Sequence, residues 1–372
     1  MSNNKQTFYR LEKLNDTMSD ANYRLLLGER SNGKSFAVKE RGLIKAWGSI
    51  NDKFMLFRRW GLEVKASYIE QYFQDAPITA ITNNECNTIN CTAGKIFLAR
   101  YNPESKVKVN SVAHVGYYRD LCGEQHFVSQ NFDDVSMGIF EEFISRDYYL
   151  PNEPTKLMNF VSTFARRRFV PVYMIGNTIS RVCPYFRDWE LTRIPRQKIG
   201  TIDRYEIHTG EYDDDGKEVI VIVSVEYCEN SGKNSKMFFG KSSEMITSGT
   251  WQVKAYPHLD GRLSDYRKMH EVIFIHTGFK FKMFFLLDKD NNPFWYVEPF
   301  TKDVTSNDLR TMRFVTHTYN ELIGLKSLNT SIGFNPLTPD EKIAFSYLDR
   351  IKFSDNLTGT DFNTCLQTIN RT

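Results

Sequence analysis

A segment near the start of the chain has the residue types and spacing needed to hold phosphate groups. Residues 28–35, GERSNGKS, fit the pattern GxxxxGK[ST] without a mismatch. Gly28 and Gly33 let the backbone curl so that successive N–H groups point at phosphate oxygens. Lys34 is expected to reach the β- and γ-phosphates of ATP, and the Ser35 hydroxyl to bind Mg²⁺. The intervening backbone amides belong to Glu29, Arg30, Ser31 and Asn32.

An acidic pair further along the chain could supply the carboxylates that such a loop needs. Glu141 and Glu142 follow the apolar segment 136–140. Glu141 is predicted to hold Mg²⁺ in a position where Asp is usual, with its carboxylate moved by about 1.5 Å, one carbon–carbon bond. Glu142 is predicted to orient and polarise the attacking water. A solvated acidic pair is the alternative. Asp133 and Asp134 are rival candidates for the metal, but they precede the apolar segment and are expected at the opposite end of the strand.

Two further features could contribute to the same chemistry. Asn177 follows the apolar segment 170–175, where an amide can donate to a phosphate oxygen or hold the water; a turn asparagine is the alternative. Arg166 and Arg167 belong to a run of three arginines. An arginine placed against a neighbouring subunit's γ-phosphate would stabilise transition-state charge, whereas a charge run is otherwise a solvated face.

Other basic residues leave two interpretations open. Arg58 and Arg59 follow the second predicted strand and indicate either a nucleotide, DNA or subunit contact or an exposed turn. Lys106, Lys108 and Arg119 lie in a region of alternating residues. They would meet DNA phosphates if that region lines a pore, and would otherwise serve solubility.

The order of apolar segments indicates how these residues are positioned. A strand at 23–27 is expected before the phosphate loop, and a helix from about Lys34 to Trp47 after it. Further strands are expected at 53–57, 136–140 and 170–175, helices at 63–73 and 154–164, and a small β insertion within 79–118. Alternation of strands and helices favours an α/β fold with a parallel sheet. The strand before the loop and the helix after it favour a phosphate loop over a chance match.

The length of 372 residues suggests about two domains. A polar stretch carrying three consecutive aspartates is typical of a turn or linker. We therefore expect an ATPase domain at 1–199, a linker or lid at 200–217 and a smaller α+β domain at 218–372. The last domain should contain a hairpin turning at 290–293 and a capped helix at 338–351.

Composition excludes some classes of protein. The formal net charge of +3 neither announces nor excludes a nucleic-acid partner. Six cysteines without a CxxC pair favour free thiols over a zinc site. The first ten residues have no apolar signal core, and the longest apolar stretches, such as 219–225, are far too short to span a bilayer. We expect a soluble intracellular protein without a membrane partner.

Five segments occur in a specific order: GERSNGKS, FMLFRRW, IFEEFISRDYYLPNE, the arginine run and GNTISRVCPYF. In order and spacing they resemble the DNA-encapsidation ATPases of small tailed phages with protein-primed linear genomes. The resemblance covers roughly residues 20–190 and thins to general organisation beyond about 200.

The resemblance implies a motor that pumps double-stranded DNA into an empty procapsid. In this family pattern the protein works in the host cytoplasm as a homomeric ring, a pentamer, docked on the portal or connector. It contacts a structural RNA or the portal directly. The first domain would be a P-loop NTPase of the additional-strand catalytic-glutamate type. The second would resemble an RNase H-like nuclease fold that has lost its catalytic acids.

The family pattern assigns phosphate and Mg²⁺ binding to Lys34 and Ser35. It assigns the metal to Glu141 and the role of catalytic glutamate to Glu142. It adds a trans-acting arginine, which is Arg166 when counted from the LPNE segment and Arg167 when counted back from Asn177.

The C-terminal domain shows no obvious triad of strand-end carboxylates. Asp288 and Asp290 lie on a predicted hairpin turn, and Glu298 is the third candidate. A two-metal nuclease needs carboxylates that converge on ions about 3.5–4 Å apart. We therefore expect a non-cleaving domain that binds nucleic acid or the portal. The alternatives are a terminase with an active nuclease, and a nucleotide-gated assembly module with little turnover.

Overall fold

In the computed structural model the chain forms two compact units, Met1–Trp251 and Gln252–Thr372. The structure describes residues 9–369 except for 112, 128–129, 146–148, 179, 214, 230–254, 277–278, 303, 306, 309–311 and 317–336.

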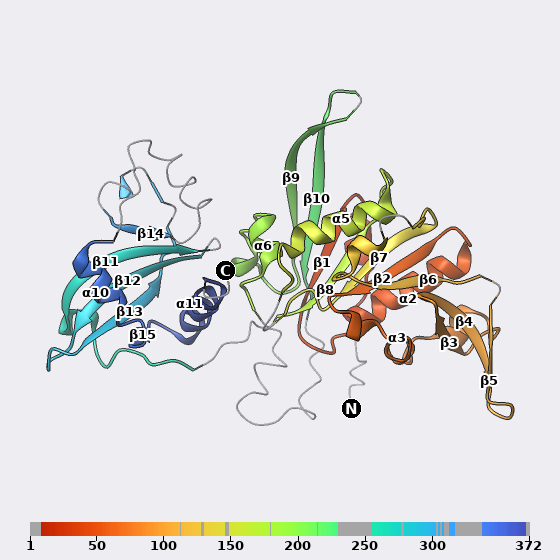
Figure 1. Cartoon of the computed structure of the whole chain (residues 1–372), viewed down its shortest axis with the longest axis horizontal. Helices are drawn as coiled ribbons and strands as arrows, with labels where there is room; N and C mark the ends of the chain where they lie inside the picture. The colour runs from red at the N-terminus through yellow and green to blue at the C-terminus, as the bar shows by residue number, and fades with distance from the viewer. Residues whose placement is uncertain are drawn as a thin grey trace, which may run out of the picture. The chain divides into compact units, whose positions relative to one another are not determined.

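Ten strands of the described residues form one mixed sheet in the first unit (Figure 1). Their bounds are β1 Tyr23–Gly28, β2 Lys53–Arg58, β3 Thr88–Thr92, β4 Lys95–Asn102, β5 Val107–Asn110, β6 Gly116–Asp120, β7 Val135–Glu141, β8 Val172–Asn177, β9 Ile202–Tyr212 and β10 Glu218–Tyr227. The order is β3-β4-β6-β2-β7-β8-β1-β10-β9, with β5 paired to β4. The run from β6 to β10 is parallel, while β3, β4, β5 and β9 pair antiparallel with their neighbours. The α/β prediction is confirmed, with a mixed rather than wholly parallel sheet.

Both faces of the parallel strands are buried, which explains why these strands are continuous apolar runs in the sequence. Leu25 and Leu27 of β1 join a core cluster with Phe160, whereas Leu26, between them, joins a second cluster with Val38. Successive side chains of a strand point to opposite faces, so each strand contributes to two cores.

Helices of the first unit cover these two cores. They are α1 Glu12–Thr17, α2 Lys34–Gly48, α3 Ala66–Tyr72, α4 Ile78–Ile81, α5 Glu153–Ala165 and α6 Pro184–Asp188. In α5, Leu157, Phe160, Val161 and Phe164 are buried at the i, i+3, i+4, i+7 spacing of one helix face. The predicted helices at 34–47, 63–73 and 154–164 are therefore present, although α3 is shorter than expected.

The predicted linker at 200–217 is wrong. Strands β9 and β10 form an antiparallel hairpin, and β10 pairs in parallel with β1, for example Tyr23 with Val223. The first unit accordingly continues to Trp251. The stretch is polar because the outer half of the hairpin projects as an arm (Figure 1), with most of its residues exposed, while Val223, Val225 and Tyr227 at its base are buried.

The second unit contains a five-stranded sheet within its described residues, in the order β14-β11-β12-β13-β15. The bounds are β11 Arg267–His276, β12 Phe279–Leu287, β13 Pro293–Pro299, β14 Phe314–Thr316 and β15 Ile351–Phe353, with helices α10 Pro339–Phe345 and α11 Asn356–Ile369. The β12–β13 hairpin is confirmed. The predicted cap of α10 is also confirmed, because Thr338 Oγ1 accepts from the Glu341 N–H at 3.2 Å, but the helix ends at Phe345 instead of near 351.

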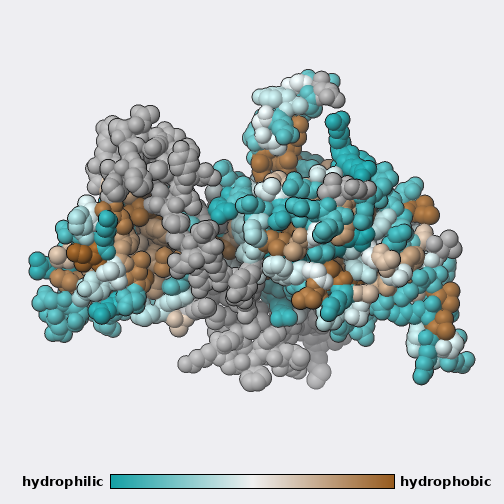
Figure 2. Space-filling view, in the orientation of Figure 1, coloured by the Kyte–Doolittle hydropathy of each residue, from teal (hydrophilic) through white to brown (hydrophobic). Residues whose placement is uncertain are grey.

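Hydrophobic residues gather on the lower part of the β9–β10 arm, at the β4–β5 hairpin and over the second unit, between hydrophilic residues (Figure 2). Val219 and Ile220 are exposed on the arm, and Val107 and Val109 on the hairpin. Among the described residues, no helix combines the length and the apolar character needed to cross a membrane.

Gly116 is required by the close packing of β6 on β2. A Cβ atom at this position would lie 2.8 Å from both the carbonyl oxygen and a ring carbon of Phe54. Gly116→Ala should therefore lower the free energy of unfolding of the first unit by about 1–3 kcal/mol, the usual cost of overpacking. Urea unfolding is the measurement. Gly48→Ala is the control, because nothing lies within 4 Å of a Cβ there; equal losses in both variants would contradict the packing argument.

Candidate active site

The predicted phosphate loop connects β1 to α2, as a strand–loop–helix unit requires. Ser31 and Gly33 have left-handed backbone conformations with φ of 64° and 99°, which curl the loop before the helix begins at Lys34. Lys34 is buried, and its Nζ donates to the carbonyl oxygen of Glu29 at 2.6 Å and to Asn32 Oδ1 at 3.1 Å. The ammonium group therefore lies within the curl of the loop. Burial lowers the pKa of Lys34.

Glu141 at the end of β7 meets this loop. Its Oε2 accepts a hydrogen bond from Ser35 Oγ at 3.2 Å, and its Oε1 accepts one from the Tyr72 hydroxyl at the end of α3. Burial raises the pKa of Glu141, and the two hydroxyl donors act in the opposite direction because they stabilise the charged form. The structure thus brings together the phosphate loop and one member of the predicted acidic pair. It also adds Tyr72, which no sequence pattern marked.

The Ser35–Glu141 pair fits a magnesium ion. Both groups offer oxygen, the ligand type that Mg²⁺ takes. Adjacent ligands of an octahedral Mg²⁺ with bonds of about 2.1 Å lie about 3 Å apart, and Ser35 Oγ is 3.2 Å from Glu141 Oε2. The extra methylene of Glu141 therefore still leaves a carboxylate oxygen at a usable position.

Glu142 directly follows β7 in a left-handed conformation, with φ of 56°. Its Oε2 forms an ion pair with Arg58 Nη2 at 2.6 Å, at the end of β2. The side chain of Glu142 is 54% exposed, so it can leave Arg58 without breaking the core. Glu142, the residue predicted to orient the water, therefore directly follows Glu141, which contacts Ser35. Its carboxylate is paired with the Arg58 guanidinium.

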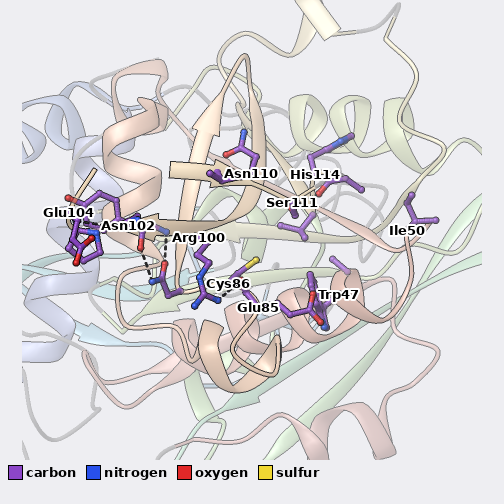
Figure 3. A pocket seen from close by; sticks show the side chains of 17 residues that line it. Trp47, Ile50, Glu85, Cys86, Arg100, Asn102, Glu104, Asn110, Ser111 and His114 are labelled. Atoms are coloured by element: carbon purple, nitrogen blue, oxygen red, sulfur yellow. Dashed lines mark hydrogen bonds between the residues drawn. The ribbon is translucent and has the colours of Figure 1, made fainter. Parts of the chain in front are cut away.

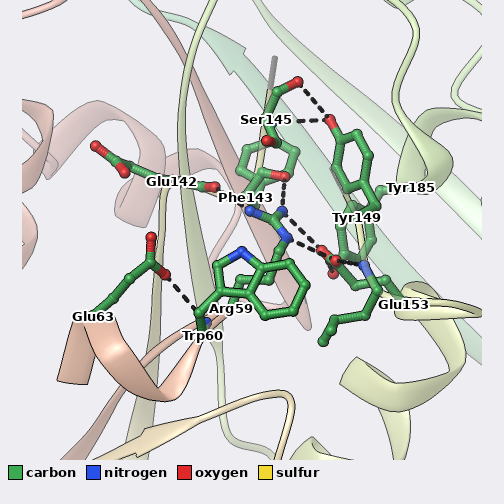
Figure 4. A network of polar contacts seen from close by, with 10 residues as sticks. Arg59, Trp60, Glu63, Glu142, Phe143, Ser145, Tyr149, Glu153 and Tyr185 are labelled. Carbon is green, nitrogen blue, oxygen red and sulfur yellow. Dashed lines mark hydrogen bonds and ion pairs between the residues drawn. The ribbon is translucent and has the colours of Figure 1, made fainter. Parts of the chain in front are cut away.

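Arg59 fixes the backbone that follows the acidic pair (Figure 4). Its guanidinium pairs with both carboxylate oxygens of Glu153, at 2.7 and 2.8 Å. It also donates to the carbonyl oxygens of Glu142 at 3.2 Å and Phe143 at 2.8 Å. Glu153 accepts a further bond at 2.9 Å from the Tyr185 hydroxyl. Arg59 is therefore a buried anchor, and the interpretation as an exposed turn is wrong for it.

Asn177 lies beside the start of the phosphate loop. In the parallel pairing of β1 with β8, Gly28 is opposite Asn177. The next residue, Thr178, donates its N–H to the carbonyl oxygen of Gly28 at 3.2 Å. The carboxyl ends of β1, β7 and β8 therefore place the loop, Glu141 and Asn177 at one edge of the sheet. The role of Asn177 as a phosphate sensor stays a prediction.

The three arginines of the run have different surroundings. Arg168 is exposed, but it donates to three backbone carbonyls, those of Phe132, Val135 and Phe164, which hold its guanidinium in place. Arg166 donates to the Gln130 carbonyl at 2.9 Å. Arg167 is exposed and forms no hydrogen bond or ion pair with any residue in the described part of the chain.

Asp133 and Asp134 lie at the opposite end of β7 from the acidic pair, as predicted. Asp134 forms an ion pair with Lys53 at 2.6 Å at the start of β2. Asp133 lies 3.8 Å from Arg166.

Of the three basic residues predicted to meet DNA if the insertion lines a pore, two are engaged within the protein. Lys108 pairs with Glu70 at 2.7 Å. Arg119 donates to the Gly94 carbonyl at 2.7 Å, and burial lowers its pKa. Lys106 is exposed at the β4–β5 turn and remains the open candidate for a DNA contact.

A separate hollow lies between the C-terminal end of α2 and the strands of the β insertion (Figure 3). Its walls include Trp47, Ile50, Arg100 and His114. Burial lowers the pKa of His114 to about 4. None of the residues predicted for phosphate, metal or catalysis lines this hollow.

The fold and the site define an α/β protein whose mixed sheet places the predicted phosphate loop beside a buried carboxylate. Residues 3–208, more than half of the chain, match the family described as Podovirus DNA encapsidation protein (Gp16). The chain belongs to this family, as the sequence resemblance predicted.

Solved structures of phage proteins are similar to this chain. "The bacteriophage Phi-29 viral genome packaging motor assembly" matches at 19% identity over 97% of this chain and 99% of that chain, with a TM-score of 0.50. "The Phi-28 gp11 DNA packaging Motor" matches at 15% identity over 98% of each chain, with a TM-score of 0.49. A large terminase from a thermophilic bacteriophage, in complex with ADP, matches at 10% identity over 95% of this chain and 82% of that chain, with a TM-score of 0.36. A search of curated proteins gave no match.

The Arg59–Glu153 pair should contribute strongly to stability, because both side chains are almost completely buried, at 6% and 0% exposure. Arg59→Met leaves the Glu153 charge buried without its partner and should cost about 3–5 kcal/mol of unfolding free energy. Chemical denaturation measures the loss. Arg204→Met, which removes the exposed pair with Asp20, is the control and should cost less than about 1 kcal/mol. Equal costs would show that Arg59 is not the anchor of this loop.

Proposed function

We propose that this chain is the ATPase of a genome-packaging motor, which hydrolyses ATP to drive double-stranded DNA into a procapsid. The observation that supports this most directly is the Ser35–Glu141 contact, which joins the phosphate loop to the acidic strand. Membership of a DNA encapsidation family supplies the nucleic-acid substrate. The Lys34 ammonium within the curl of the loop agrees with a nucleotide ligand.

The residues divide the work of ATP hydrolysis among them. Backbone amides of 29–35 and the Lys34 ammonium bind the phosphates. Ser35 and Glu141 would hold Mg²⁺, which when bound neutralises charge on the β- and γ-phosphates. Glu142 would release Arg58 and accept a hydrogen bond from the attacking water, orienting it towards phosphorus.

The strand order supports the additional-strand catalytic-glutamate type of P-loop NTPase. Strand β8 lies between β1, which leads into the phosphate loop, and β7, which ends in the acidic pair. Asn177 at the end of this inserted strand lies opposite Gly28, where its amide could contact the γ-phosphate or the water.

The positions of Arg166 and Arg167 support action on a neighbouring subunit. Both precede β8 and lie near the start of β7, because Arg166 contacts Asp133. Glu141 is at the other end of this 7-residue strand, roughly 20 Å away. Neither arginine can reach its own γ-phosphate across that distance, so a ring is the arrangement that uses them. Arg167, which is not engaged within the described part of its own chain, is the better candidate.

The second unit is proposed to bind nucleic acid or the portal without cutting DNA. Asp288 is half-buried and caps the β12–β13 turn, accepting N–H bonds from Asp290 and Asn292 at 2.8 Å. Glu298 lies opposite Lys282 near the other end of the hairpin, roughly 16 Å along the strand. These carboxylates are too far apart to share two metal ions about 3.5–4 Å apart, as the nuclease alternative needs. A degenerate RNase H-like fold is kept as part of the proposal.

The assembly is proposed to be a homomeric ring, a pentamer, at the portal or connector of the procapsid in the host cytoplasm. The fold likeness to a Phi-29 viral genome packaging motor assembly agrees with a part in such a machine. A structural RNA remains an additional candidate partner.

Lys34→Ala should abolish DNA-stimulated ATP hydrolysis. Losing one preorganised donor at a reacting group typically costs about 10²–10³-fold in rate. Phosphate release with and without double-stranded DNA is the measurement. Arg41→Ala, on the exposed side of the same helix, should hydrolyse ATP like the wild type. A Lys34→Ala protein with full ATPase activity would refute the nucleotide site. A wild-type rate of hydrolysis that is the same with and without DNA would favour the assembly-module alternative.

Rings mixed from two inactive variants test the trans arginine. Arg167→Ala subunits keep the phosphate loop, and Lys34→Ala subunits keep the arginine. Each variant alone should hydrolyse ATP more slowly than the wild type, Arg167→Ala by roughly 10³-fold or more. Mixing the two should restore hydrolysis at each interface where an intact phosphate loop meets an intact Arg167. Arg166→Ala is the matched comparison and should lose less. Mixed rings that stay inactive would remove the trans mechanism.

A further inference from the structure

The hydroxyl of Tyr72 is one of two donors on the carboxylate of Glu141. The Tyr72 hydroxyl donates to Oε1, and Ser35 Oγ donates to Oε2 at 3.2 Å. Each oxygen of the carboxylate thus has its own partner, from two different helices. The carboxylate plane is therefore fixed, with Oε2 turned to the phosphate loop.

Glutamate at position 141 makes such a restraint necessary. Compared with Asp, the side chain has one more rotatable bond and reaches about 1.5 Å further. An unrestrained Glu can place its carboxylate in several rotamers, and only some of them put an oxygen next to Ser35. A donor on the far oxygen selects among these rotamers.

The ring of Tyr72 is itself held in place by the helix that follows the phosphate loop. Lys39 of α2 donates from Nζ to the Tyr72 carbonyl at 2.7 Å, and its ammonium lies 4.5 Å from the centre of the Tyr72 ring. Lys39 also pairs with Asp75, just after α3. The support for Tyr72 therefore comes from the same helix that carries Lys34 and Ser35.

We propose that Tyr72 is a positioning residue that adapts this site to glutamate, holding Glu141 so that one carboxylate oxygen faces the divalent cation bound with ATP. It acts through Glu141 and does not touch the nucleotide. This inference rests on the proposed nucleotide site, and it adds a residue outside the phosphate loop and the acidic pair.

Metal-dependent nucleotide binding by the full chain tests the proposal. The probes are a fluorescent ATP analogue, titrated with Mg²⁺ and with excess chelator, and Mn²⁺, whose binding is followed by electron paramagnetic resonance. Removing an outer partner of a metal ligand typically costs about 10–100-fold in metal affinity. Tyr72→Phe should weaken Mn²⁺ binding by about that factor, while metal-free affinity for the analogue and the thermal unfolding midpoint stay at wild-type values. Tyr68→Phe, an exposed tyrosine on the same helix, should change none of these.

Glu141→Asp separates positioning from general support of the fold. The shorter carboxylate cannot contact Ser35 and Tyr72 together, so Tyr72→Phe in the Glu141→Asp background should change Mn²⁺ affinity less than about twofold, a non-additive result typical of residues that act as a unit. An equal loss in both backgrounds, or no loss in Tyr72→Phe, overturns the proposal while leaving the nucleotide site intact. A wild type whose analogue affinity is the same with and without metal would instead refute the proposed function, and the positioning role with it.

Discussion

The contact between Ser35 and Glu141 is the interaction on which the account of this site depends. It exists because β1 and β7 are parallel strands of one sheet, separated by β8, so their carboxyl ends reach the same edge. The helix after β1 and the turn after β7 then project their polar groups into a common space. A one-residue shift in either pairing would turn the relevant side chains to the other face of the sheet. The register of buried apolar strands is therefore what sets the separation of the two predicted magnesium ligands.

A second layer of contacts holds the acidic end of β7 in place. Arg59 is satisfied on one side by Glu153 and on the other by the backbone carbonyls of Glu142 and Phe143. Burying an arginine is costly unless its donors are paired, and here a fully buried carboxylate and two carbonyls do so. The rigid support ends at the backbone of Glu142, because its side chain is half exposed and pairs with Arg58 at the surface. The carboxylate of Glu141, the predicted metal ligand, is therefore fixed, whereas the neighbouring carboxylate of Glu142 can move.

The sequence alone predicts those elements and site residues that depend on a local pattern of residue types. The strand–loop–helix unit at 23–48 and the other parallel strands of the first half follow from glycine spacing and apolar runs, and the structure contains them. The position of Asp134 at the far end of β7 is predictable, because chain direction alone decides which end of a strand a residue occupies. The boundary at 200–217 failed, because an exposed hairpin arm has the same polar composition as a linker. Arg59 and Tyr72 could not be identified, since their partners, Glu153 and Glu141, are 94 and 69 positions away in the chain.

The most direct test of the central claim is an experimental structure of the full chain with a non-hydrolysable ATP analogue and Mg²⁺. Phosphate oxygens are expected within hydrogen-bonding distance of the amides of 29–35. A metal ion is expected between Ser35 Oγ and a Glu141 oxygen, bound directly or through one water. A nucleotide found elsewhere, for example in the hollow beside Trp47 and His114, with Ser35 and Glu141 sharing no ion, would contradict the central claim.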